Sequence, residues 1–173
     1  MFIELLRKRR SIRRYEDRQI EDEKVQLLVE AALRSPSSRG LNPWEFIVVR
    51  DRAALEALSR AKPHGSGFLK GAPLGIVVCA DPQRADTWVE DTSIASIIIQ
   101  LQAEDLGLGS CWVQIRMREH DSETSAEDYV KKVLGLPEHL RVESIIAIGY
   151  PAERKPGHPK EALPYEKIHY ERF

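Results

Sequence analysis

A regular pattern of apolar residues marks the early part of the chain. Apolar side chains recur three and four positions apart, the spacing of one helical face, at Val25, Leu28, Val29, Ala32 and Leu33. The pattern starts after Asp22 and stops at Ser35 and Pro36, where a residue before proline disfavours helix. We therefore predict an amphipathic helix between these points.

Short runs rich in β-branched residues predict strands. Two such runs, Trp44–Val49 and Leu74–Ala80, are each preceded by proline and followed closely by aspartate, and both are typical of buried strands. Runs at residues 110–115 and 142–148 predict two more strands by the same criteria.

Two further helices follow from the later pattern. Residues 87–106 are apolar on nearly every face, which predicts a central, buried helix that stops at the glycines after it. A capping box formed by Thr124 and Glu127 predicts the start of another helix, and Gly135 predicts its end.

Helices come first in this order, and strands mixed with helices follow, without repeats or linkers, so we expect one α+β domain over residues 1–173. The segment 149–173 has four prolines and no helical period. We expect this C-terminal arm to pack on something other than its own domain.

Composition narrows the classes of function. The chain is 42% hydrophobic and 31% charged with a net charge of -1, which fits a soluble globular protein and gives no reason to expect nucleic acid as a partner. The five histidines are scattered, so we expect no metal site. No signal peptide and no run of about 20 apolar residues is present, so we expect a cytoplasmic protein with no membrane contact.

Two segments could carry chemistry. Residues 9–15 come just after a short predicted helix. They contain Arg9, Arg10, Ser11 and Arg13, a cluster suited to clamp the phosphate of a cofactor, although a solvated basic turn has the same composition. The loop 35–44 is rich in small hydroxyl side chains that could bind a heterocycle, although by itself it is also an ordinary loop.

Taken together, these segments resemble the nitroreductase family. The arginine and serine cluster, the Ser35 to Trp44 loop, residues 106–112 and residues 146–152 match that family in order along nearly the whole chain. The resemblance implies a three-layer α+β fold, with a central mixed or antiparallel sheet flanked by helices, in an intertwined homodimer. It also implies two shared FMN sites and C-terminal arms that wrap the partner.

The resemblance also implies roles for residues. Arg9, Arg10, Ser11 and Arg13 would hold FMN, with Arg13 tuning the ring, while Pro36, Ser37 and Ser38 would come from the other subunit. The remaining positions carried over are Val113 and Gln114 near the ring, and Lys160, with Arg154 as its competitor, near the phosphate. Gly40 stands where many relatives have asparagine, with Asn42 two residues on, which leaves one ring contact open.

The implied activity is hydride transfer from NADH or NADPH through FMN to a small acceptor such as a nitroaromatic or a quinone. No side chain is required as acid or base, because the cofactor carries the redox chemistry. Two alternatives stay open: a protein that stores flavin or a specialised flavin enzyme of the same fold, and a binding domain whose arginines hold another anion. The sequence identifies neither the acceptor nor the preferred nucleotide, and residues 60–71 contain no recognisable substrate motif.

Overall fold

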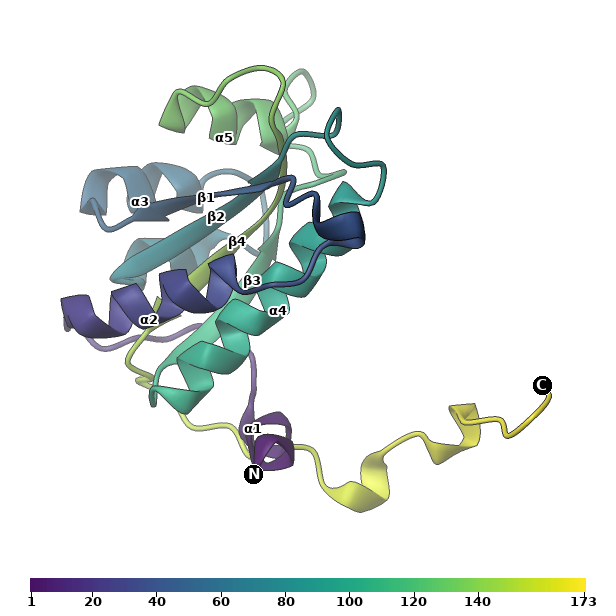
Figure 1. Ribbon diagram of the computed structural model, residues 1–173. Helices are drawn as coiled ribbons and strands as arrows, with labels where there is room; N and C mark the ends of the chain where they lie inside the picture. The colour runs from purple at the N-terminus through teal and green to yellow at the C-terminus, as the bar shows by residue number, and fades with distance from the viewer.

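The computed structural model describes residues 1–173 and is built around one antiparallel sheet (Figure 1). The strands lie in the order β1-β2-β4-β3. Their bounds are Trp44–Val49 for β1, Leu74–Ala80 for β2, Gly109–Gln114 for β3 and Arg141–Gly149 for β4. Every neighbouring pair is antiparallel, so the predicted α+β class is confirmed.

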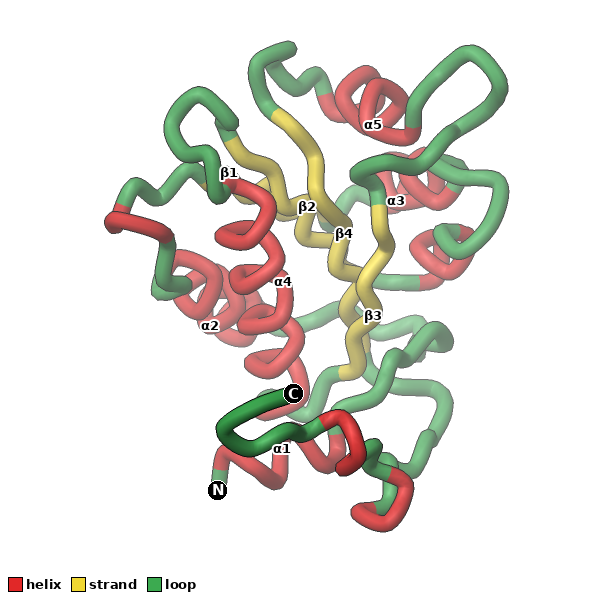
Figure 2. Tube along the Cα trace, turned by 90° about the vertical axis from the view of Figure 1, so that its right-hand side faces the viewer, coloured by secondary structure: helices red, strands yellow, loops and turns green.

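Helices cover both faces of the sheet, which gives the predicted three layers (Figure 2). The helices are α1 (Phe2–Lys8), α2 (Asp22–Leu33), α3 (Arg52–Ser59), α4 (Trp88–Asp105) and α5 (Ala126–Leu134). One apolar core joins α2 and α4 to the sheet, and a second joins α3 and α5 to the opposite face. No helix is long and apolar enough to cross a membrane.

The inner strands are buried because both of their faces are covered. In β2, Ile76 and Val78 enter the core under α2 and α4, and Val77 and Cys79 enter the core under α3 and α5. All seven residues of β2 are buried. This alternation by two residues explains why the strand reads as one continuous apolar run.

The outer elements correct two predictions of burial. Strand β1 lies at an edge with one neighbour, and Val49 is its only buried residue. Helix α4 buries the side facing the sheet, but Ile94 and Ile97 are 39% and 38% exposed. Both elements therefore expose apolar side chains that a single chain leaves uncovered.

The sequence also misplaced one helix start and missed one helix. Ser125, not Thr124, caps α5: its Oγ accepts from the Asp128 amide at 3.0 Å, while the Thr124 amide donates to Asp121 at 2.8 Å in the preceding turn. Gly135 ends α5 with φ 65°, as predicted. The unpredicted helix is α3, whose N-cap Asp51 accepts from the Ala54 amide at 2.7 Å.

Candidate functional site

The arginine-rich segment 9–15 runs beside the edge strand β3. Ser11 forms a parallel bridge with Ser110, and the Ile12 amide donates to the Ser110 carbonyl at 2.9 Å. A Cβ on Gly109 would lie 2.8 Å from the side chain of Ile12. Glycine at this position therefore allows the segment to approach the strand closely.

The first residues of the arm hold the same segment from the other side. We call residues 150–157 the arm root. The Glu16 amide donates to the Tyr150 carbonyl at 2.9 Å, and the Ala152 amide donates to the Arg14 carbonyl at 2.9 Å. The Lys155 Nζ donates to the Ser11 carbonyl at 2.9 Å, and the guanidinium of Arg10 donates to the Pro156 carbonyl. The segment is thus fixed by contacts distant in sequence.

Side chains between these elements stabilise the arrangement. The part-buried hydroxyl of Tyr15 donates to the Ile12 carbonyl at 2.6 Å, and desolvation raises the pKa of this phenol. Glu153 accepts from the Arg13 amide at 2.6 Å, and this hydrogen bond is the main cause that lowers the Glu153 pKa. Glu153 also pairs with Lys155 at 3.1 Å. A charged Glu153 therefore orders the backbone at Arg13.

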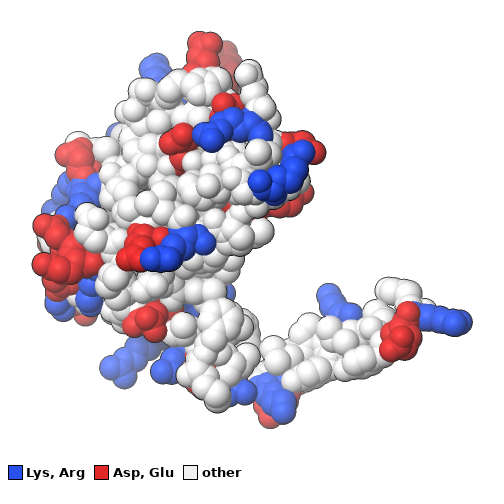
Figure 3. Space-filling view, in the orientation of Figure 1, with Lys and Arg blue, Asp and Glu red and all other residues white.

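A cleft of about 930 Å³ lies between α1, the end of α4 and the arm root. Its lining includes Lys8, Arg10, Arg154 and Lys155, with Glu104 and Glu153 as its carboxylates. Lys and Arg side chains are also visible around α1 and the arm root in Figure 3. We call this space the site cleft; its charge suits an anionic ligand.

Several arginines at this site have no carboxylate partner. Arg9, Arg13 and Arg154 form no ion pair, whereas Arg18, Arg34 and Arg50 on other surfaces do. The guanidinium of Arg13 instead lies 5.8 Å from the centre of the Phe68 ring. The structure thus brings the predicted residues Arg9, Arg10, Ser11 and Arg13 together with free positive charge.

Strand β3 contributes backbone groups at its open edge. Because the Ser110 carbonyl points away from β4 to Ile12, alternation along an antiparallel strand turns the backbone groups of Trp112 and Gln114 to the same side. The side chain of Val113 is fully buried in the core. Of the two predicted ring contacts, Gln114 therefore has a backbone amide available at the edge, and Val113 does not.

The two predicted tail cations lie in different parts of the arm. Arg154 lines the site cleft. Lys160 lies in the exposed outer part of the arm, away from residues 9–13 of its own chain (Figure 1). Lys155 and Glu153, which contact the arginine segment directly, were not identified from the sequence. Their only sequence signal is that they follow shortly after the last strand.

The second predicted segment, with Pro36, Ser37 and Ser38, is held elsewhere. The Ser38 amide donates to Asp91 Oδ1 at 2.9 Å, and Ser37 Oγ accepts from the Asn42 amide at 2.9 Å. Asn42 is thus engaged inside the loop. Gly40 has φ 64°, a left-handed conformation that asparagine also tolerates, so glycine is not required there by backbone alone.

The two predicted halves lie near opposite ends of α4. Asp91, which holds Ser38, is in the first turn of that helix, and Glu104, which lines the site cleft, is in its last turn. A helix rises 1.5 Å per residue, so these positions are separated by about 20 Å. One chain alone does not bring the two halves together (Figure 1).

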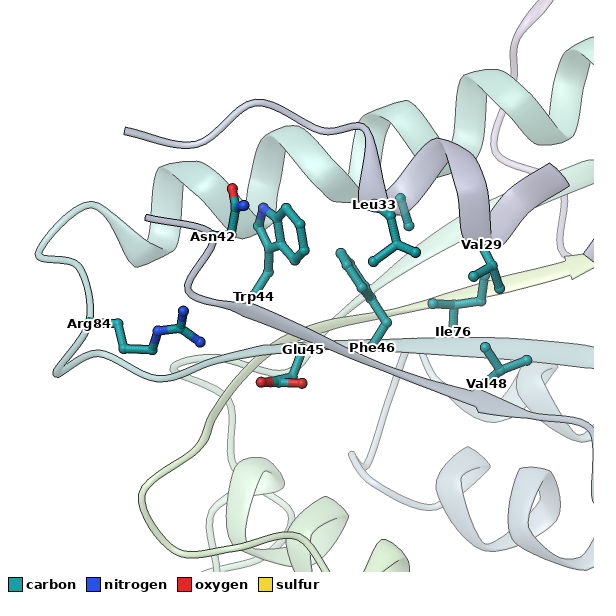
Figure 4. Close-up of a pocket in the computed structure, with 10 residues that line it drawn as sticks. Val29, Leu33, Asn42, Trp44, Glu45, Phe46, Val48, Ile76 and Arg84 are labelled. Carbon is teal, nitrogen blue, oxygen red and sulfur yellow. The ribbon is translucent and has the colours of Figure 1, made fainter. Parts of the chain in front are cut away.

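A second, apolar hollow lies between α2 and β1 (Figure 4). We call it the α2–β1 groove; it measures about 360 Å³. Its apolar lining consists of Val29, Ala32, Leu33, Trp44, Phe46, Val48 and Ile76. The buried Nε1 of Trp44 has no hydrogen-bond partner there.

Comparison with known proteins places the chain in a family. Residues 6–150 match the family model for the nitroreductase family. An FMN-dependent nitroreductase from Clostridium difficile R20291 has 48% sequence identity and a TM-score of 0.97, with 99% of each chain covered. An NADH dehydrogenase of Thermus thermophilus is 31% identical over 93% of this chain and 91% of its own length. An FMN reductase [NAD(P)H] of Bacillus subtilis is 27% identical over 96% of this chain and 74% of its own length.

The predicted resemblance is therefore confirmed over most of the chain, including the arginine segment and the whole sheet. On the family match and on the similarity to these relatives, the chain belongs to the nitroreductase family.

Proposed function

We propose that the protein is an FMN-dependent oxidoreductase that transfers a hydride from NADH or NADPH to a small acceptor such as a nitroaromatic or a quinone. The observation that carries this proposal is the site cleft, which Arg10, Arg154 and Lys155 line beside Gly109, the first residue of β3. The activities of similar proteins, among them an FMN-dependent nitroreductase and an FMN reductase, support the same proposal.

Residues that line the site cleft, together with residues of the arginine segment and of β3 next to it, fit FMN. Arg9, Arg10 and Arg154 offer guanidinium groups for its phosphate. Ser11 offers a hydroxyl for the ribityl chain, and the backbone amide of Gln114 offers a donor to the edge of the ring. Lys155 reaches the same segment through the Ser11 carbonyl, at 2.9 Å.

FMN supplies the hydride chemistry when bound, so the protein has to bind, orient and tune it. Arg13 would stabilise negative charge on the ring, and no carboxylate neutralises its guanidinium. The backbone of Arg13 is kept in place by Glu153 through a bond of 2.6 Å. These groups act by position and charge and transfer no proton.

The active form in this proposal is a homodimer with two shared sites. Two copies related by a two-fold axis, with their α4 helices antiparallel, would bring residues 36–38 of one copy to the arginines of the other. Exposed Ile94 and Ile97 on α4 give such a contact an apolar surface. The separation of the half-sites along α4 supports this arrangement.

The arm 149–173 completes the proposed dimer by packing on the partner. Its outer part leaves the body of its own chain (Figure 1) and exposes the apolar side chains Leu163, Tyr165, Ile168, Tyr170 and Phe173. The α2–β1 groove is an apolar receptor of matching character, and Trp44 Nε1 needs an acceptor there. We propose that the arm of one subunit fills the groove of the other, and that Lys160 makes its contacts in that assembly.

An anaerobic titration tests the proposed function. FMN-reconstituted protein is titrated with NADH and then, in a separate sample, with NADPH while flavin absorption is followed, and nitrofurazone or a quinone is added afterwards. Bleaching that reverses on addition of the acceptor is expected and identifies the donor. Bound flavin that neither nucleotide bleaches would overturn the reductase proposal and favour flavin storage, and failure to bind FMN would overturn both.

A further inference from the structure

A bulge in the central strand β4 places one carboxyl group in an unusual position. Val78 pairs with Ser144 and Cys79 pairs with Val142, so Glu143 is an extra residue that has no partner in β2. Such a bulge turns a side chain away from the regular alternation. Here the turned side chain reaches across to β3.

Glu143 is buried without a complete set of partners. It is 4% exposed, its Oε1 accepts from Gln114 Nε2 at 3.3 Å, and its Oε2 has no hydrogen bond. The nearest cation is Arg116, whose Nε lies 4.0 Å from Oε2. A buried carboxyl held so loosely costs stability compared with an apolar residue, so a role in stability does not explain it.

The side chain of Gln114 links Glu143 by hydrogen bonds to other residues of the edge strand β3. Its Nε2 also donates to the Arg116 carbonyl at 3.1 Å, and its Oε1 accepts from Trp112 Nε1 at 2.8 Å. One carboxyl, one amide and one indole therefore form a chain of hydrogen bonds on the face of β3 that turns toward α4. Trp112 and Gln114 are the two residues whose backbone groups face the open edge.

We propose that Glu143 is a positioning residue that fixes the β3 edge for the flavin through Gln114 and Trp112. This inference rests on the proposed function for the ligand, but the hydrogen-bonded chain itself belongs to the protein without ligand. By holding both side chains on one face of β3, the hydrogen-bonded chain fixes the direction in which the backbone amide of Gln114 points at the open edge. A merely structural role for Glu143 would affect the whole domain and not this edge in particular.

The test compares Glu143→Leu, which removes the acceptor and keeps an apolar side chain in a buried place, with Glu143→Gln, which keeps an acceptor oxygen. For Glu143→Leu we expect the FMN dissociation constant of the reconstituted protein to rise about five- to tenfold, the value of one hydrogen bond, with a shift in the visible absorption of bound flavin. Glu143→Gln should restore both to within about twofold of the original chain.

Two further variants make the result specific. Gln114→Leu should reproduce the effect of Glu143→Leu, and the double variant should be no worse than either single one, because all remove the same chain. Val25→Ala, in the core under α2, serves as the control for general destabilisation and should leave FMN affinity unchanged.

Amide hydrogen exchange in the flavin-free protein provides a readout that does not depend on activity or on FMN. Exchange at Cys111 and Val113, whose backbone amides face β4, should be faster in Glu143→Leu than in the original chain, and unchanged in Val25→Ala. Equal exchange together with equal FMN affinity would overturn the positioning role. Loss of FMN binding by the original chain itself would instead overturn the proposed function, and the exchange result would still decide on the positioning of the edge.

Discussion

The two edge strands of the sheet have opposite surroundings. Strand β3 is bordered by the chain's own arginine segment and arm root, and its neighbours are mostly charged. Strand β1 has no neighbour on its outer side in the chain and lines the apolar α2–β1 groove. The β3 edge is bordered by polar segments of its own chain and suits a ligand. The β1 edge is apolar, as protein–protein interfaces often are.

The tryptophans of the two edge strands differ in the hydrogen bonding of their indole nitrogens. The indole of Trp112 on β3 donates to Gln114 at 2.8 Å, and the buried Nε1 of Trp44 on β1 has no acceptor. An unpaired buried donor is costly and is usually satisfied in the functional assembly. We infer that the side chains of the β3 edge find their hydrogen-bond partners within one chain, and that Trp44 on β1 finds its acceptor only in a second chain.

The largest effect is expected at the polar edge. Arg13→Ala should weaken FMN binding about 10- to 100-fold, because a charge-assisted hydrogen bond contributes about 1.5–3 kcal/mol. Quenching of FMN fluorescence on titration with flavin-free protein measures the affinity. The matched control is Arg14→Ala, since Arg14 is exposed and bonds through its backbone only. Equal losses in both variants would contradict a specific role for Arg13.

A smaller effect is expected at the apolar edge. Deleting residues 158–173 removes the outer arm and keeps the arm root that holds the arginine segment. The dimer should dissociate about tenfold more readily, since buried aromatic anchors each contribute more than about 1 kcal/mol. Sedimentation equilibrium measures the change. An unchanged dimer dissociation constant would contradict the proposal that the arm fills the α2–β1 groove.

The next prediction concerns pH and the buried acid of β4. Burial is the main cause that raises the pKa of Glu143 above its ordinary 4.5, opposed by Gln114 and Arg116, while Glu127 on α5 adds to the rise. A raised pKa in the folded state gives stability that is complete below 4.5 and is lost as pH rises through the folded value.

Glutamine cannot ionise, so Glu143→Gln should gain in free energy of unfolding relative to the original chain as pH rises from 4.5 to neutrality. Urea unfolding at a series of pH values measures the difference. A gap that stays constant with pH, or that narrows as pH rises, would show that the carboxyl is not held in a costly environment.

The smallest effect separates the two tryptophans. Trp44→Phe removes the unpaired donor and keeps a smaller aromatic ring, so it should change the stability of the single chain little. It should weaken the dimer by about two- to tenfold, the range for one net hydrogen bond. Thermal unfolding and sedimentation measure the two quantities. If dimer affinity rises instead, Trp44 Nε1 has no acceptor in the partner.

The sequence predicted the elements whose pattern is determined by burial. Strand β2 and helix α2 have apolar residues that repeat with the period of the element, and both were found where expected. The edge position of β1 could not be predicted, because its apolar run has the same composition as a central strand. Its surplus of apolar residues is the signal of a partner rather than of a core.

The site was predictable only where it is local in sequence. The cluster Arg9, Arg10, Ser11 and Arg13 comes from adjacent positions and is a recognisable motif. Lys155 meets Ser11 only because the chain returns after β4, a contact 144 residues apart. The bulge at Glu143 depends on the register of β2 against β4, and no spacing rule within one strand indicates it.

In the proposed dimer, each flavin site takes its arginines from one subunit and residues 36–38 from the other. One chain carries Arg13→Ala and another carries Ser38→Phe; each variant alone should bind little FMN. Heterodimers isolated with two affinity tags then measure FMN stoichiometry. A shared site predicts one FMN per heterodimer, because both lesions fall in one site and the other site is intact. A heterodimer that binds no FMN, while the original chain binds two, would contradict the shared site.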